Sequence, residues 1–204
     1  MATVSGLFDD YHDASQAVRE LHAAGIANAD ISLVTADLGA AEAPKPSHTA
    51  ADVAGGVEAG AGAGVVLGGA GGLLAGVGLL TIPGIGPAIA GGWLLATAVG
   101  AAAGAVLGGA GGGIIGALIA GGVPENHAHV YSEGLRRGGT LVTVKTEDAK
   151  VDQARAILDD NDAIDVSERK AAYEGEGWRG FDETAAPLTT TKQASRDGAV
   201  RPSM

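Results

Sequence analysis

The sequence contains no cysteine, which excludes disulfide bonds, thiolate nucleophiles and cysteine-ligated zinc or iron–sulfur sites. Aromatic residues are scarce, with two Trp, three Tyr and two Phe among 204 residues. Basic residues are the minority: 13 Lys and Arg stand against 24 Asp and Glu, and the formal net charge is −11. A general nucleic-acid-binding surface needs clustered Lys and Arg, so we expect no nucleic-acid partner.

Charge is also missing from one long internal segment. Residues 59–124 contain no Asp, Glu, Lys, Arg or His, and 25 of the 35 glycines lie within 55–122. The N-terminus has no basic stretch before an apolar run, so we expect no secretory signal. We therefore predict a discontinuous domain formed by 1–37 and 125–168, a linker at 38–54, a glycine-rich hairpin at 55–122 and a disordered tail at 169–204.

The two polar parts each show the pattern strand, helix, strand. Strand patterns at 3–8 and 31–35 enclose a helix whose apolar residues are spaced by three and four. In the second part a strand at 140–145 precedes a helix capped by Asp148 and a short strand at 163–166. Two such units in one sheet form a ferredoxin-like βαβ–βαβ sandwich. The predicted class is α+β: a ferredoxin-like domain interrupted by a long Gly/Ala-rich helical hairpin, with a disordered C-terminal tail.

Glycine recurs at every fourth position along both halves of the uncharged segment, with Ala96 in the one gap of the second series. Such spacing lets two helix backbones approach closely, so we predict helices over 55–81 and 88–121 that pack on these glycines. A cluster of two prolines and two glycines between them predicts the turn. The helix-packing residues are Gly56, Gly60, Gly64, Gly68, Gly72, Gly76, Gly92, Gly100, Gly104, Gly108, Gly112 and Gly116, and the turn residues are Pro83, Gly84, Gly86 and Pro87.

Two environments fit this predicted hairpin. Residues 59–82 as a helix would span about 36 Å, enough to cross a hydrocarbon core of about 30 Å. Trp93 lies near a helix end, where an interfacial indole is expected. We therefore expect a transmembrane hairpin in the cytoplasmic membrane, with the polar domain facing the cytoplasm. Glycine and alanine contribute little to membrane transfer, however, and the alternative is a soluble cytoplasmic homo-oligomer whose hairpins form a protected core.

No combination of residues has the pattern of an active site. His127 and His129 are two apart, which places them on nearly opposite faces of a helix and disfavours a shared metal. Residues 111–116 fit the pattern G-x-G-x-x-G, but they lack the preceding strand and the later acidic residue of a dinucleotide site. We expect no catalytic, cofactor-binding or metal-ligating residues and conclude that the protein is not an enzyme.

Two arginines are candidates for an anion contact. Arg136 and Arg137 follow one another near the end of a helix predicted over 125–137, where they could touch a phosphate or a lipid headgroup. Alternatively, Glu133 and Arg137 form an ordinary pair on the helix surface, because they are four residues apart. Trp178 and Phe181 in the tail are either incidental or part of a short contact helix.

Five short motifs lie within residues 3–168. The motifs are GLFDD at 6–10, AVREL with AGI within 17–26, DISLV at 30–34, IPGIGP at 82–87 and YSEGLRRGG at 131–139. Together they resemble the bacterial heat-induced general stress protein family, the YflT-like domain. The resemblance implies a bacterial stress-associated protein of undefined activity and supplies no catalytic residues.

The expected function is that of a non-enzymatic stress-response protein attached to the membrane by its glycine-zipper hairpin. The expected partners are further copies of the chain and a lipid bilayer, and no protein partner is identified. The alternatives are a soluble self-assembling homo-oligomer and a small-molecule-binding regulatory module, the latter by fold analogy.

Overall fold

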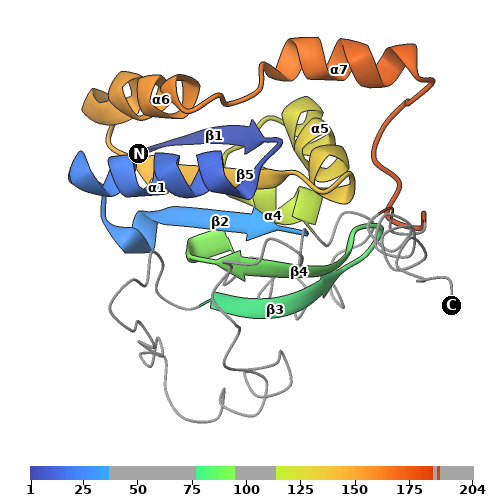
Figure 1. Cartoon of the computed structure of the whole chain (residues 1–204), viewed down its shortest axis with the longest axis horizontal. Helices are drawn as coiled ribbons and strands as arrows, with labels where there is room; N and C mark the ends of the chain where they lie inside the picture. The colour runs from blue at the N-terminus through green and yellow to red at the C-terminus, as the bar shows by residue number, and fades with distance from the viewer. Residues whose placement is uncertain (37–76, 95–113, 186–187, 189–204) are drawn as a thin grey trace, which may run out of the picture.

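The computed structural model describes residues 1–36, 77–94, 114–185 and 188 (Figure 1). These residues form an antiparallel sheet with helices on both faces, which confirms the α+β class. The elements are β1 (Ala2–Phe8), α1 (Tyr11–Ala23), the 3-10 turn η1 (Asn28–Asp30), β2 (Ile31–Thr35), β3 (Val77–Ile82), β4 (Gly86–Gly91), α4 (Ile114–Ala120), α5 (Glu125–Arg136), β5 (Thr140–Thr146), the 3-10 turn η2 (Asp148–Lys150), α6 (Val151–Asp160) and α7 (Val166–Gly175).

The strand order places β5 between the two strands of the N-terminal part. The sheet has five strands in the order β1-β5-β2-β4-β3. β5 pairs with β1 along its whole length, from Thr146 opposite Ala2 to Thr140 opposite Phe8. On its other side Val144 lies opposite Ile31. The two polar parts of the chain, far apart in the sequence, therefore contribute neighbouring strands to one sheet.

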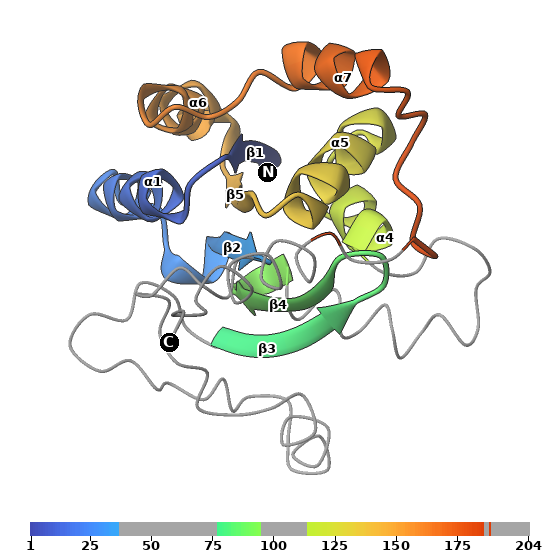
Figure 2. The ribbon, with the colours of Figure 1, turned by 45° about the vertical axis from the view of Figure 1, so that its right-hand side comes forward.

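Each face of the sheet carries its own apolar core, as Figure 2 shows with α1 and α6 on one side and α4 and α5 on the other. Alternate residues of a strand point to opposite faces, so the same strands supply both cores. On one face Phe8 and Val142 pack with residues of α1 and α6, including Leu21 and Leu158. On the other, Leu7, Leu141 and their neighbours pack with α4 and α5.

The prediction that Asp148 caps a helix is wrong, because Asp148 lies in η2 and α6 begins after Lys150 without a side-chain cap. The strands and helices expected in the two polar parts are otherwise confirmed, except for the strand at 163–166. That prediction is wrong because Val166 begins α7 instead. The carboxylate of Asp165 accepts hydrogen bonds from the backbone N–H groups of Ser167 and Glu168, at 2.8 and 2.9 Å, and so caps the helix. One contact of the expected strand persists, since the Ile164 N–H donates to the Leu7 carbonyl at 2.8 Å.

The prediction of helix for 77–81 and 88–91 is also wrong. These residues lie in β3 and β4, which form a β-hairpin and join the sheet through β2. The reason lies in the turn, where Gly84 and Gly86 have φ of +76° and +98° and bring the two strands into register. The linker at 38–54 and the remaining predicted helical residues at 55–76 and 95–113 lie outside the described residues.

Part of the predicted disordered tail is ordered in the structure. Residues 169–175 belong to α7, and residues 176–185 continue across the molecule, so disorder from 169 is the wrong prediction for this stretch. Its aromatic side chains explain the difference. Tyr173 and Phe181 are both buried, and Phe181 joins the core between α4, α5 and the sheet. A segment with little apolar periodicity is thus held by a few large side chains.

A first prediction concerns Tyr131 of α5, whose hydroxyl donates to the Ser5 carbonyl at 3.2 Å. Burial, and to a lesser degree the charge of Asp165, raise the pKa of Tyr131 to about 12. A raised folded-state pKa stabilises the protein below the unfolded pKa of about 10, and this contribution is lost as the pH rises from about 10 to 12. We expect the free energy of unfolding to fall by roughly 3 kcal/mol over this range, from a shift of about 2 units.

Urea unfolding at pH 9 and pH 12 measures this change. Tyr131→Phe should remove most of the difference between the two pH values, because the variant has no phenol to ionise. An equal fall in parent and variant would mean that other groups cause the loss of stability.

Candidate functional site

A group of interacting charged and aromatic side chains lies where α7 crosses α5. We call this group the α5–α7 clamp. Its α5 members come from the YSEGLRRGG motif, and the others lie in the stretch that the sequence analysis assigned to the tail. The clamp consists of Glu133, Arg136, Arg137, Tyr173, Glu176 and Trp178.

Glu133 is the centre of the clamp. Its side chain is 2% exposed, and its two carboxylate oxygens face the two arginines that follow it in the helix. Arg137 Nε donates to Oε1 at 2.8 Å, and Arg136 Nη1 lies 3.4 Å from Oε2. The expectation of an ordinary surface pair is therefore wrong, because the carboxylate is buried. Removing one partner of a buried ion pair leaves an uncompensated charge, so this contact fixes the local structure more strongly than a surface pair does.

Arg137 extends the clamp to α7. Its guanidinium lies 4.1 Å from the centre of the Tyr173 ring, and Nη1 is 2.5 Å from a carboxylate oxygen of Glu176. Burial alone would lower the pKa of Arg137, but the hydrogen bonds to Glu176 and Glu133 outweigh it and the pKa is raised. Trp178 packs edge-on against Tyr173, with 5.7 Å between ring centres. The Arg137 guanidinium thus links the end of α5 to the end of α7.

Asp9 provides a further tie between α7 and the rest of the molecule. Arg169 Nη2 donates to its carboxylate at 2.8 Å, and this hydrogen bond raises the pKa of Arg169 despite the opposing effect of burial. Burial also raises the pKa of Tyr173, although Arg169 and Arg137 partly oppose that shift. The phenol therefore stays neutral at physiological pH and serves as a ring for the guanidinium groups.

The predicted anion contact at Arg136 and Arg137 is not tested by these distances. Both guanidinium groups already face the carboxylate of Glu133, and Arg137 also faces Glu176. An external anion would have to compete with a buried carboxylate four residues or fewer away in the same helix. The arrangement is suited to anchoring α7.

Two glycines of the predicted helix-packing set lie among the described residues, and the other ten lie outside them. Gly116 lies within α4. Gly92 follows β4 with φ of +88°, and a Cβ there would overlap the Ile31 carbonyl and lie 2.7 Å from the Ser32 Cα. Gly92 therefore permits close backbone approach, but to a strand rather than to a helix.

Two of the four predicted turn residues lie in a turn, which belongs to a β-hairpin rather than to a helical hairpin. Pro83 and Gly84 lie between the strands, whereas Gly86 and Pro87 are the first residues of β4. A Cβ at Gly84 would lie 2.8 Å from the Asp182 carbonyl oxygen, so this turn contacts the chain beyond α7. The prolines and glycines thus predict the position of the chain reversal correctly, but they do not distinguish a turn between strands from a turn between helices.

A row of hydroxyl groups across the sheet has no counterpart in the sequence analysis. The strand register places Ser5 and Ser32 on either side of Thr143, with all three side chains on the α4–α5 face. Ser32 Oγ donates to the Gly91 carbonyl at 2.6 Å and so ties β2 to β4. In the sequence these hydroxyl residues appear only as alternating polar positions of β1 and β5, and this alternation does not predict that Thr143 is buried.

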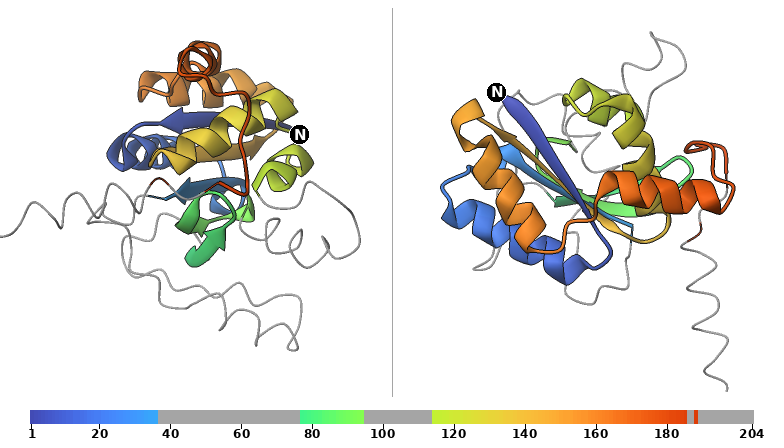
Figure 3. Two further views of the ribbon diagram at one scale, coloured as in Figure 1. Left: turned by 90° about the vertical axis from the view of Figure 1, so that its right-hand side faces the viewer. Right: turned by 90° about the horizontal axis from the view of Figure 1, so that it is seen from above.

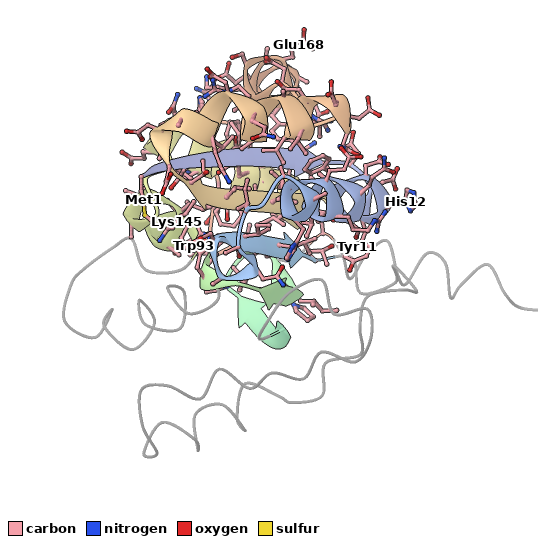
Figure 4. The ribbon with its side chains drawn as sticks, turned by 90° about the vertical axis from the view of Figure 1, so that its left-hand side faces the viewer. Met1, Tyr11, His12, Trp93, Lys145 and Glu168 are labelled. Carbon is pink, nitrogen blue, oxygen red and sulfur yellow. The ribbon has the colours of Figure 1, made fainter. Side chains whose placement is uncertain are left out.

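Trp93 packs against Lys145, which is two residues beyond Thr143 and therefore on the same face of β5. Lys145 Nζ lies 3.8 Å from the centre of the indole ring, and Figure 4 shows the two side chains side by side. On its other side the indole lies so close to Gly121 that a Cβ there would overlap it. The indole expected at a membrane interface thus packs between β5 and the end of α4.

Within the described part of the chain, no group of three or more His, Asp or Glu residues could hold a metal ion. The helices described there are also too short or too polar to cross a bilayer. Comparisons of the chain with known protein families, with curated proteins and with solved structures find no match.

A second prediction compares two glycines that share a backbone conformation and differ in their surroundings. Gly92 has φ of +88° against the backbone of β2, whereas Gly138 has φ of +96° with nothing within 4 Å of a Cβ. Gly138→Ala should cost about 1–2 kcal/mol from the left-handed conformation alone. Gly92→Ala should cost more than about 4 kcal/mol, because β4 must also move away from β2. Equal losses in urea unfolding would show that Gly92 has no packing role.

A third prediction concerns Glu133. Glu133→Gln leaves Arg136 and Arg137 without their buried carboxylate and should cost about 3 kcal/mol, at the lower end for a broken buried pair because Arg137 is 31% exposed. Glu176→Gln is the matched control, since Glu176 is 59% exposed and its pairing should contribute less than about 1 kcal/mol. Chemical denaturation of both variants measures the difference, and similar losses would contradict the central role of Glu133.

Proposed function

We propose that the protein is a non-enzymatic stress protein that acts by self-association, with β3 of one copy adding to β3 of a second. The observation that carries this proposal is the composition of the β3 edge. Its sequence, VGLLTI, has neither a charged residue nor a proline. Strand edges of this kind pair readily with other chains, and natural proteins usually protect them with charges, prolines or covering segments.

The opposite edge of the sheet is protected in a way that makes the contrast informative. The segment after α6 runs along β1, where the Ile164 N–H donates to the Leu7 carbonyl. A Cβ at Gly6 would lie 3.2 Å from the Cβ of Ala163, so this segment packs closely on the strand. β1 is therefore covered by the chain itself at Gly6 and Leu7. β3 has β4 on one side, and no described residue pairs with its other side.

Two-fold symmetry makes a second copy the natural occupant of such an edge. An antiparallel pair of β3 strands presents the same residues from both copies and closes the assembly as a dimer. Backbone hydrogen bonds provide the affinity in this mode of recognition. The uncharged segment 59–124, in which β3 lies, places no like charges opposite one another at the interface.

The stress role and the ferredoxin-like relationship belong to the same proposal. The stress role has its support in the five motifs of residues 3–168. The relationship is supported by β5 lying between β1 and β2, with α1 and α6 on one face. Attachment to the cytoplasmic membrane is the second candidate, favoured by the absence of charge from 59–124.

A fourth prediction tests the β3 edge. Thr81→Lys adds a charge to β3 and should raise the dissociation constant of the dimer at least about tenfold, because a lysine on an edge strand disfavours pairing with another chain. Ala2→Lys adds the same charge to the covered edge strand β1 and should leave association unchanged. Analytical ultracentrifugation of the full chain over a concentration series measures both.

Two results would contradict the proposal. A parent protein that is monomeric at all concentrations has no β3 dimer, and equal effects of the two lysines would place the interface elsewhere. Sedimentation of the untagged protein with membranes, in the absence of detergent, would favour the second candidate.

A further inference from the structure

The β3–β4 hairpin is attached to the rest of the sheet at only one end among the described residues. β4 pairs with β2 from Ile89, opposite Thr35, to Gly91, opposite Leu33. The first residues of β4 and the turn therefore extend beyond the end of β2, as Figure 1 shows. Backbone pairing with β2 cannot hold this overhanging part.

The C-terminal segment holds it instead. We call residues 176–185 the strap. A Cβ at Gly84 in the turn would lie 2.8 Å from the Asp182 carbonyl oxygen, 2.9 Å from the Glu183 Cα and 3.0 Å from the Phe181 ring. The Phe181 side chain is 7% exposed and belongs to the same apolar cluster as Ile82 and Ile85. The turn of the hairpin thus packs against residues almost 100 positions later in the chain.

The strap reaches the turn from the α5–α7 clamp. Figure 3 shows it descending from α7 past α5 toward the hairpin. Trp178 packs on Tyr173 at its start, and the Phe181 N–H donates to His129 Nδ1 of α5 at 3.3 Å. Gly177 directly precedes Trp178 and Gly180 directly precedes Phe181, and their φ values of +90° and +151° set the direction of the strap before each contact.

We propose that the strap is a releasable clasp that controls the position of the β3–β4 hairpin and, through it, the pairing of the β3 edge. This inference rests on the proposed function for its second half only. With the strap closed, the hairpin is held in line with the sheet and β3 is a preorganised template for a second copy. With the strap open, the overhanging end of the hairpin moves and the template is lost.

The small number of anchors makes release a local event. Phe181 is the apolar side chain of the strap that enters the core, and Asp182, Thr184 and Glu183 beyond it are polar. Segments with few buried apolar groups open at a lower free energy than the whole protein unfolds. Glu176 and Trp178 of the clamp lie at the start of the strap, whereas the buried Glu133, its two arginines and Tyr173 precede it. These contacts, together with the pair between Arg169 and Asp9, can keep α7 docked while residues 179–185 open.

The test is hydrogen exchange of the full chain, comparing Phe181→Ala with Leu188→Ala. Leu188 is exposed and lies just beyond the strap, so its variant is a matched loss of an apolar side chain. Phe181→Ala should speed the exchange of protected amides in 77–91 at least about tenfold while β1 and β5 exchange as in the parent. Phe181→Leu, which keeps part of the contact, should give an intermediate rate, and Leu188→Ala should have no effect.

The outcomes separate the clasp from the proposed function. Unchanged exchange in 77–91, or equal acceleration across the whole sheet, would overturn the clasp. Faster exchange of the hairpin with at least about a tenfold rise in the dimer dissociation constant would support both halves. Faster exchange of the hairpin with unaltered association would support the clasp as a holder of the hairpin and overturn its control of the β3 edge.

Discussion

The pairing of β5 with both β1 and β2 is the constraint on which the rest of the molecule depends. β1 and β2 run in the same direction, because each is antiparallel to β5, and they are joined by α1. Neither can complete its backbone hydrogen bonds until β5 enters between them, more than 100 residues after β2 has left the sheet. The chain between β2 and β5 must therefore leave the centre of the sheet and come back to it. Before it comes back, β4 and β3 extend the sheet on the side of β2 that faces away from β5.

The two faces of this sheet differ in the polarity of their buried residues. On the α1–α6 face the core is almost entirely apolar, with Phe8, Leu21 and Val142 at its centre. On the α4–α5 face the apolar cluster adjoins the hydroxyls of Ser32 and Thr143, which are also buried. A buried polar group costs free energy unless it is bonded, so the bond from Ser32 to the Gly91 carbonyl favours one position of β4. The polar row thus adds register specificity where β4 meets β2 over a short length.

The elements that the sequence predicts well are those whose apolar spacing belongs to a single element. β1, α1, β2, β5 and α6 each show their period without reference to the rest of the chain. The burial of Glu133 could not be predicted this way: the spacing to Arg137 identifies its partner, but α7 is what excludes water from it. Phe181 is similar, because one aromatic residue in a polar stretch gives no period. In both cases the missing information is which distant segment covers the residue.

The glycines of the uncharged segment show why a regular spacing alone does not determine the element. A four-residue glycine period predicts close helix packing, because glycine lets two backbones approach. Gly92 provides the same close approach where β4 leaves the sheet beside Ile31, and Gly84 provides it where the strap crosses the turn. In both positions φ is positive, which a helix interior does not use. The sequence between the glycines, uncharged and with two prolines at one reversal, fits an edge hairpin as well as a helix. What distinguishes the two is the partner backbone, β2 on one side and the strap on the other.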